Sequence, residues 1–250
     1  MSSDSTNFPT DHWIIDIGMN DGKDTEYYAK RGFKVVSFEA NPVLVEAARS
    51  KFQNRYPQIE IRNLAISDDQ GELTFYVNKF NSAWSSLDEV LGARRDGAEQ
   101  IKVASCNLVN ELAALSELIH YVKIDIEGFD HIALRQILKL PHLPQYVSVE
   151  NGSEAMLKDL RSSGYSGFKF SNQRYVPAQS VPEASPHGKI IEHDFLISSS
   201  GVFGEDLVGR WLTYEEAIAV NEGLSYGRKK APNNLWADSV GWFDLHAKLG

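Results

Sequence analysis

The chain has 250 residues, of which 42% are hydrophobic, enough for one large α/β domain with an appendage. Its formal net charge of -9 at pH 7 disfavours a nucleic-acid partner, because an acidic surface repels phosphate backbones. The single cysteine, Cys106, excludes an internal disulfide, and no apolar run approaches the roughly 20 residues of a membrane span. The polar start of the chain lacks the features of a signal peptide, so we expect a cytoplasmic, soluble protein.

Apolar strand-like runs alternate with helical stretches along most of the chain. The expected strands are 13–18, 34–39, 59–67, 72–78, 101–105, 121–127 and 146–150, followed by a closing hairpin of 168–171 and 190–198. The expected helices are 24–31, 41–54, 108–118 and 130–140, one that Ser153 caps, and one after a Thr213–Glu216 capping box. This alternation predicts a mostly parallel sheet with helices on both faces.

A glycine pattern separates the first strand from the first helix. Asp16, Gly18 and Gly22 form D-x-G-x-x-x-G, in which the glycines let the backbone approach a ligand beyond the strand end. The spacing is not that of a dinucleotide fingerprint, and Asp16 and Asp21 would repel a pyrophosphate. Glu39 ends the second strand, where an acidic side chain can accept both hydroxyls of an adenosine ribose. Together these features predict a cofactor of nucleoside type.

Charged residues also mark the end of the expected central strand. Lys123, Asp125 and Glu127 alternate there, and charges in a doubly buried strand must be paired or must emerge at its end. We expect Lys123 to pair with a neighbouring carboxylate inside the sheet, and Asp125 and Glu127 to line the cleft. Glu150 and Asn151 end the next strand beside the same cleft, although they also fit an ordinary strand-end turn.

Four phrases resemble the FkbM-type methyltransferase family: 16–22 (DIGMNDG), 37–42 (SFEANP), 81–87 (NSAWSSL) and 122–128 (VKIDIEG). The resemblance covers about residues 13–200. It implies the class I methyltransferase fold, a Rossmann-like α/β three-layer sandwich with a mostly parallel seven-stranded sheet and a reversed final hairpin. It also implies S-adenosylmethionine as donor and a hydroxyl on a sugar, lipid or natural-product small molecule as acceptor.

The resemblance further implies that residues 13–200 form the S-adenosylmethionine-binding domain, and it implies the roles of single residues. We expect residues 1–12 to form a flexible tail. We expect 201–250 to form an extension that covers the acceptor site together with 81–87 and 172–189, because loops beyond the strand ends carry specificity. Glu39 would bind the ribose. The other expected cofactor-binding residues are Asp16, Gly18, Asn20 and Gly22 at the amino-acid end, Asn41 near the ribose, and Ala65 and Ile66 beside the adenine.

Two catalytic mechanisms are compatible with the sequence. Methyl transfer to a hydroxyl needs a carboxylate base or a metal to remove the proton. Asp125, Glu150 and Asn151 look like the magnesium site of catechol O-methyltransferase, and their oxygens suit Mg²⁺. In the metal-free reading, Asp125 or Glu127 takes the proton directly, and Glu150 and Asn151 orient the acceptor. The sequence leaves both open. The alternative functions are an NAD-dependent oxidoreductase on a similar sheet and a non-catalytic nucleoside-binding relative.

Overall fold

The structure is a computed structural model that describes residues 11–230 and 241–250. The expected tail therefore lies, up to residue 10, outside the described residues. The chain divides into two compact units, a first within residues 9–144 and a second within residues 145–250. Within the described ranges, no helix is both long and apolar enough to cross a bilayer.

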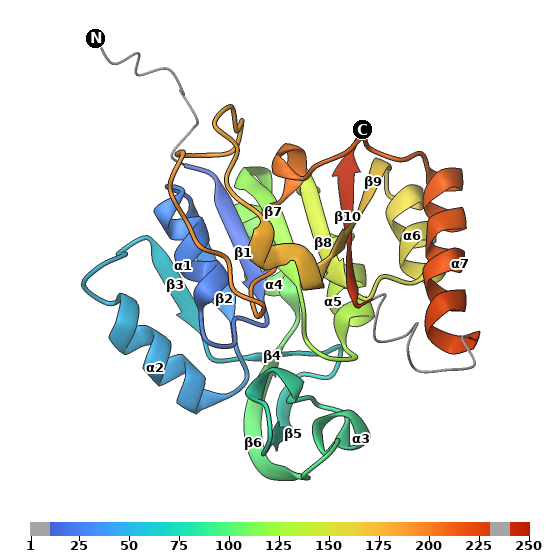
Figure 1. Ribbon diagram of the computed structural model, residues 1–250. Helices are drawn as coiled ribbons and strands as arrows, with labels where there is room; N and C mark the ends of the chain where they lie inside the picture. The colour runs from blue at the N-terminus through green and yellow to red at the C-terminus, as the bar shows by residue number, and fades with distance from the viewer. Residues whose placement is uncertain (1–10, 231–240) are drawn as a thin grey trace. The chain divides into compact units, whose positions relative to one another are not determined.

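The main sheet has seven strands, which lie in the order β3-β2-β1-β7 in the first unit and β8-β10-β9 in the second (Figure 1). The first unit holds four strands that pair in parallel: β1 (Trp13–Ile17), β2 (Lys34–Phe38), β3 (Ile59–Arg62) and β7 (Ile119–Ile124). The second unit holds β8 (Tyr146–Glu150), β9 (Tyr165–Asn172) and β10 (Phe243–Leu249), and β10 runs antiparallel to both of its neighbours. The predicted α/β class, with a mostly parallel sheet and a reversed last strand, is confirmed.

Local sequence explains the elements of the first unit. Strands β1 and β2 are mostly apolar, and every residue after the first of each strand is buried, as expected for parallel strands covered on both faces. Helix α1 (Lys23–Lys30) packs on β1 and β2, α2 (Pro42–Phe52) on β3, and α5 (Asp130–Ile137) on β7 and on the short α4 (Leu108–Leu112). A 3-10 turn, Ala113–Leu118, follows α4. Asn41 caps α2, because its Oδ1 accepts a 3.0 Å hydrogen bond from the Val43 amide.

A second, three-stranded sheet belongs to the same unit. It consists of β4 (Ala65–Ile66), β5 (Gly71–Asn78) and β6 (Ala98–Cys106), with β6 in the middle. A 3-10 turn, Ser82–Trp84, and helix α3 (Glu89–Gly92) connect β5 to β6. We call residues 71–106 the β5–β6 lobe; Figure 1 draws it around the labels β5, β6 and α3.

The strand expected over 59–67 is in fact two strands, β3 in the main sheet and β4 in the small one. The break falls at Asn63, whose side-chain amide donates to the carbonyl oxygens of Glu39 and Ala40 at 2.9 and 3.0 Å. These bonds attach the chain to the end of β2, so it leaves the first ladder and enters the second.

In the second unit, two predicted helix starts are confirmed and one predicted strand is wrong. Ser153 caps α6 (Glu154–Ser162), and Thr213 and Glu216 form the reciprocal bonds of a capping box at the start of α7 (Tyr214–Lys230). The hairpin strand expected over 190–198 is wrong, because that stretch has no regular structure and β10 takes the place between β8 and β9. Residues 201–250 therefore contribute a strand to the main sheet. Short 3-10 turns are Gln173–Ala178 and Gly204–Asp206.

Candidate functional site

The centre of the candidate site is a buried lysine surrounded by carboxylates. Lys123 Nζ lies 3.3 Å from Asp16 Oδ1, 3.7 Å from Asp125 Oδ2 and 4.0 Å from Asp24 Oδ2, and it donates to the Gly18 carbonyl at 2.8 Å. Burial alone lowers the pKa of Lys123, but Asp16, Asp125 and Asp24 outweigh it and hold this pKa well above its usual range. The expected pairing of Lys123 with a carboxylate inside the sheet is confirmed.

The Asp16 carboxylate is buried beneath the loop after β1 and binds side chains of neighbouring elements. The side chain is fully buried, and Oδ2 accepts a 2.6 Å hydrogen bond from Thr25 of α1. The carboxylate thus ties β1 to α1 and to Lys123 of β7. The expected contact of Asp16 with a cofactor stays a prediction.

The loop after β1, residues 16–22, has a backbone that side chains would obstruct. Gly18, Asn20 and Gly22 all have positive φ, of 86°, 49° and 74°. A β-carbon on Gly18 would lie 1.8 Å from the carbonyl oxygen of Asp125, and one on Gly22 would lie 2.9 Å from the Phe52 ring. The two glycines of the D-x-G-x-x-x-G pattern are therefore required by close approach as well as by conformation.

Glu39 closes this loop against the end of β2. Its Oε2 accepts a 2.8 Å hydrogen bond from the Asn20 amide, and its Oε1 accepts one of the same length from the Asn41 amide. Burial raises the pKa of Glu39, and the two amides act against that rise. Each carboxylate oxygen has two lone pairs, so each retains one acceptor site for a ligand. This fixed pair of acceptors suits the two adjacent hydroxyls of a ribose.

The expected adenine side lies next to this carboxylate. Ala65 and Ile66 form β4 and are buried, and Ala65 packs with Ala40, Phe75 and Val103 in one apolar cluster. Asn63 joins this region to Glu39 through its bond to the Glu39 carbonyl. Sequence reasoning did not identify Asn63, because its importance depends on two bonds to carbonyls more than twenty positions away.

The loop after β7 differs from the expected strand. β7 ends at Ile124, so Asp125 and Glu127 lie beyond it, and Glu127 has a φ of 45°. Asp130 holds the turn, with Oδ1 accepting from the Ile126 amide at 2.9 Å and Oδ2 from the Gly128 amide at 3.0 Å. Burial raises the pKa of Asp130 to about 6, although these amides oppose the rise. The alternation of Lys123, Asp125 and Glu127 in the sequence therefore does not place them on one strand face.

Asp125 and Glu127 have different surroundings. The Glu127 carboxylate receives two hydrogen bonds from the guanidinium of Arg94, at 2.7 and 3.0 Å, and its side chain is 18% exposed. The Asp125 side chain is 39% exposed, with Lys123 at 3.7 Å. Arg94 was not among the residues predicted for the site, because no local pattern links it to a residue 33 positions away. Asp125 is thus the more accessible of the two candidate bases.

The β5–β6 lobe borders the cofactor loop. Ser82 Oγ donates a 3.0 Å hydrogen bond to Asn20 Oδ1, and Ser86 Oγ donates one of 2.7 Å to the Glu127 carbonyl. The sequence phrase 81–87 therefore contacts both of the loops that carry the candidate site residues. Its expected place on the acceptor side stays a prediction.

The expected magnesium site gains no support. Across residues 11–230 and 241–250, no three or more His, Cys, Asp or Glu side chains are grouped so that they could hold a metal ion. Asp125 belongs to the first unit and lies beside Lys123. Glu150 and Asn151 belong to the second unit. There Glu150 lies opposite Asp244 of β10 in the strand register, and the Asn151 backbone amide donates to the Phe243 carbonyl.

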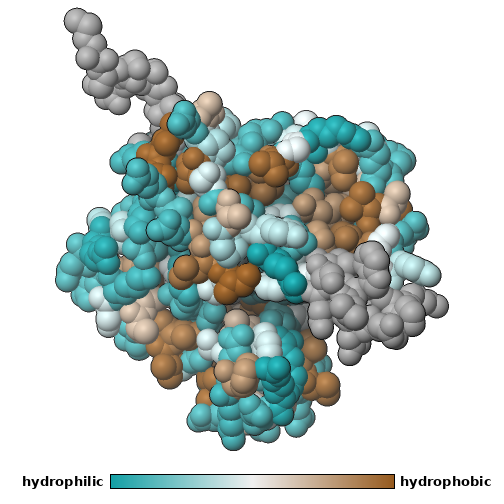
Figure 2. Space-filling view, in the orientation of Figure 1, coloured by the Kyte–Doolittle hydropathy of each residue, from teal (hydrophilic) through white to brown (hydrophobic). Residues whose placement is uncertain are grey.

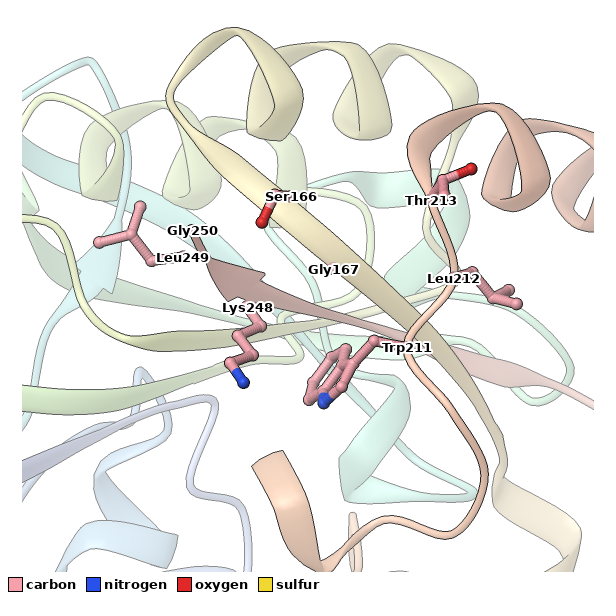
Figure 3. Close-up of a pocket in the computed structure, with 8 residues that line it drawn as sticks. All are labelled: Ser166, Gly167, Trp211, Leu212, Thr213, Lys248, Leu249 and Gly250. Carbon is pink, nitrogen blue, oxygen red and sulfur yellow. The ribbon is translucent and has the colours of Figure 1, made fainter.

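A shallow pocket of about 320 Å³ lies in the second unit (Figure 3). Trp211 and Lys248 lie side by side on its wall, and both bind Glu205, through Trp211 Nε1 at 2.9 Å and Lys248 Nζ at 2.6 Å. Ser166, Gly167, Leu212, Thr213, Leu249 and Gly250 complete the lining. None of the predicted cofactor-binding residues belongs to it.

The fold and the glycine loop together define an α/β protein of the Rossmann-like class. Residues 16–165 match the family model described as the methyltransferase FkbM domain, a span of more than half the chain. The chain belongs to this family, which supports activity as an S-adenosylmethionine-dependent methyltransferase. No curated protein sequence matches the chain.

Several solved structures resemble the chain at low identity. A TehB-like methyltransferase from Corynebacterium glutamicum is 14% identical, over 66% of this chain and 69% of that one, with a TM-score of 0.33. A methyltransferase from Archaeoglobus fulgidus is 12% identical, over 95% and 86%, with a TM-score of 0.43. A predicted O-methyltransferase from Agrobacterium tumefaciens is 13% identical, over 64% and 65%, with a TM-score of 0.38.

Proposed function

We propose that the chain transfers the methyl group of S-adenosylmethionine to a hydroxyl oxygen of a small-molecule acceptor. The observation that carries the proposal is the Glu39 carboxylate, which the Asn20 and Asn41 amides hold in place at the end of β2. Beside it, the left-handed backbone of Gly18 and Gly22 leaves no side chain between the loop and a ligand. These residues fit a ribose and an amino-acid group without a pyrophosphate, as the D-x-G-x-x-x-G spacing predicts.

The bound donor supplies an electrophilic methyl group on a positively charged sulfur. The chain contributes position and a proton acceptor. Holding the acceptor oxygen in line with the methyl group supplies much of the rate of such a transfer. Asp125 is the proposed general base, because its carboxylate is partly exposed and its backbone carbonyl lies at the contact between the two loops. The hydroxyl proton passes to the Asp125 carboxylate as the oxygen bonds to the methyl carbon and the carbon–sulfur bond breaks, with neutral S-adenosylhomocysteine as the leaving group.

Glu127 has a positioning role in this proposal. Both of its carboxylate oxygens are engaged by Arg94, which fastens the β5–β6 lobe to the loop after β7. A bidentate arginine pair of this kind fixes orientation as well as charge. Glu127 therefore sets the distance between the lobe and the Asp125 carboxylate, and we assign it no proton transfer.

The test is donor binding followed by turnover. Calorimetry should detect binding of S-adenosylmethionine and S-adenosylhomocysteine, and no binding of NAD. The protein should then move the label from methyl-labelled donor into a small-molecule extract, with products found by mass spectrometry. Binding of NAD without the donor would instead favour the oxidoreductase. Donor binding without transfer to any extract would favour the non-catalytic relative.

A further inference from the structure

The β5–β6 lobe carries an exposed cluster of two aromatic rings and two arginines. The Phe80 and Trp84 rings stack with centroids 5.4 Å apart and an interplanar angle of 23°. The Arg95 guanidinium lies 4.4 Å from the Phe80 centroid and 5.4 Å from the Trp84 centroid, and the Arg94 guanidinium lies 4.8 Å from Trp84. Phe80 is 55% exposed. Figure 2 shows brown hydrophobic residues among teal ones where Figure 1 draws this lobe. We call Phe80, Trp84 and Arg95 the aromatic ledge.

The two arginines differ in charge balance. The Glu127 carboxylate neutralises Arg94 through two hydrogen bonds. Arg95 is exposed, and no carboxylate of the described chain lies within 4.0 Å of its guanidinium. A guanidinium that stacks on aromatic faces keeps its edge N–H groups free to bind a carboxylate or phosphate in bidentate fashion. In a chain of net charge -9, this leaves one prearranged anion-binding group on the ledge.

A single buried side chain holds both parts of the ledge. The Asn78 amide nitrogen donates to the carbonyl oxygens of Gly92 and Arg94 at 2.8 and 2.9 Å. Its Oδ1 accepts from the amides of Phe80 and Asn81, both at 2.9 Å. All four hydrogen-bonding positions of the Asn78 side chain are therefore used. They connect the segment that carries Phe80 and Trp84 to the turn that carries Arg94 and Arg95, which we call the arginine turn.

The arginine turn is also conformationally strained. Arg95 has a φ of 68°, in the left-handed region that disfavours residues other than glycine. Such strain persists only where surrounding bonds impose it, and it is concentrated at functional positions. Here the bonds of Asn78 to the preceding carbonyls impose it. The turn directs Arg95 onto Phe80, and a relaxed turn would lose this contact.

The ledge lies next to the proposed cofactor site. Ser82, between Phe80 and Trp84 in the sequence, donates to the Asn20 side chain of the cofactor loop at 3.0 Å. Arg94, next to Arg95, binds Glu127 in the loop that carries the proposed base. Residues that contact the two loops are thus at most two positions from a ledge residue in the sequence.

We propose that the aromatic ledge binds the acceptor, and that the acceptor carries an anionic group, a carboxylate or a phosphate, which Arg95 recognises. The inference rests on the proposed function and adds the class of the acceptor. The Phe80 and Trp84 rings would pack against the apolar face of the same molecule. A nucleic acid is a poor alternative, because a single unpaired cation on an acidic protein does not hold a phosphate backbone.

The first test measures anion binding directly. The protein, saturated with S-adenosylhomocysteine, is titrated with inorganic phosphate, glucuronate and glucose while the arginine Nε–Hε signals are followed by NMR. Arg95→Gln identifies the Arg95 signal by its loss. The matched control is Arg55, an exposed arginine that also lies over an aromatic ring, Tyr56, at 5.6 Å. The Arg95 signal should shift with phosphate or glucuronate and stay unchanged with glucose, while the Arg55 signal stays unchanged throughout.

The second test uses the acceptor found in an extract. Its labelled product should be retained on an anion-exchange resin, and phosphatase treatment should abolish retention for a phosphate ester but not for a carboxylate. Arg95→Gln should raise KM for that acceptor roughly tenfold or more, with kcat little changed, and Arg95→Lys should recover only part of the loss. Arg55→Gln should leave KM unchanged.

The outcomes separate this inference from the proposed function. Calorimetry on Arg95→Gln should give unchanged donor affinity. Equal shifts of Arg55 and Arg95, no Arg95 shift with either anion, or a neutral product would each overturn the anionic acceptor site. Failure of the wild-type protein to bind the donor would overturn the proposed function, and the same NMR titration of Arg95 without S-adenosylhomocysteine would still decide whether the ledge binds anions.

Discussion

Gly18 and Asp125 meet where the loop after β1 touches the loop after β7: a β-carbon on Gly18 would lie 1.8 Å from the carbonyl oxygen of Asp125. The Gly18 carbonyl also accepts a hydrogen bond from Lys123, two residues before Asp125. The spacing between the proposed donor loop and the proposed base therefore depends on the absence of one side chain.

Gly18→Ala tests this contact. We expect it to lower the free energy of unfolding by about 2–5 kcal/mol, the sum of a left-handed backbone cost and of displacing a packed carbonyl. Gly209→Ala is the matched control, because Gly209 has a φ of 84° against 86° for Gly18 but no atom within 4 Å of its β-carbon position. Its cost should be only about 1–2 kcal/mol. Urea unfolding measures both, and equal losses would show that the loops do not press on each other.

Glu39→Gln tests the proposed ribose contact. The amide side chain offers one acceptor oxygen where two backbone amides now donate, so one donor loses its partner and the ribose loses an acceptor. We expect donor binding to weaken by about 1–3 kcal/mol in calorimetry. Glu72→Gln, at an exposed position on β5, is the control and should bind like the wild type. Wild-type affinity in Glu39→Gln would refute the ribose assignment.

Asp125→Asn and Glu127→Gln should separate the base from the positioning residue. Asp125→Asn removes the proton acceptor and should lower kcat roughly 100-fold or more with little change in KM. Glu127→Gln keeps an acceptor for Arg94 but loses the charge, so it should mainly raise KM. Steady-state kinetics with an identified acceptor measures both. The assignment is reversed if Glu127→Gln loses kcat and Asp125→Asn keeps it.

Asp130 predicts a pH dependence of stability. Burial raises its folded pKa from the ordinary 3.8 to about 6. A raised folded pKa gives a contribution to stability that is fully present below the unfolded pKa and is lost as pH rises through the folded value. The contribution should therefore fall by about 2 kcal/mol between pH 4 and pH 7.

Asp130→Asn removes that titration, at the cost of one hydrogen bond to the turn that does not depend on pH. The wild type minus the variant should show the fall in urea unfolding across this range. Parallel curves for the wild type and Asp130→Asn would contradict the raised pKa.

Local signals in the sequence determined most of the regular elements and pointed to the residues of the proposed donor half of the site. Asn41 with Pro42, Ser153 and the Thr213–Glu216 box each start a helix, because a cap needs only a few neighbouring residues. The sequence identified the glycine pattern and Glu39 together for the same reason. The strand, the tight turn and the end of the next strand that carry them are set by short-range order.

Tertiary structure alone decided the last strand and the acceptor half. β10 enters between β8 and β9 from more than seventy residues further along the chain, and the apolar run over 190–198 offered an equally good local pattern. Arg94 meets Glu127, and Asn78 connects Phe80 to the Arg94 turn, through bonds between residues that no periodicity relates. Such pairings depend on which segments the fold brings together, and each side chain taken alone is compatible with solvent.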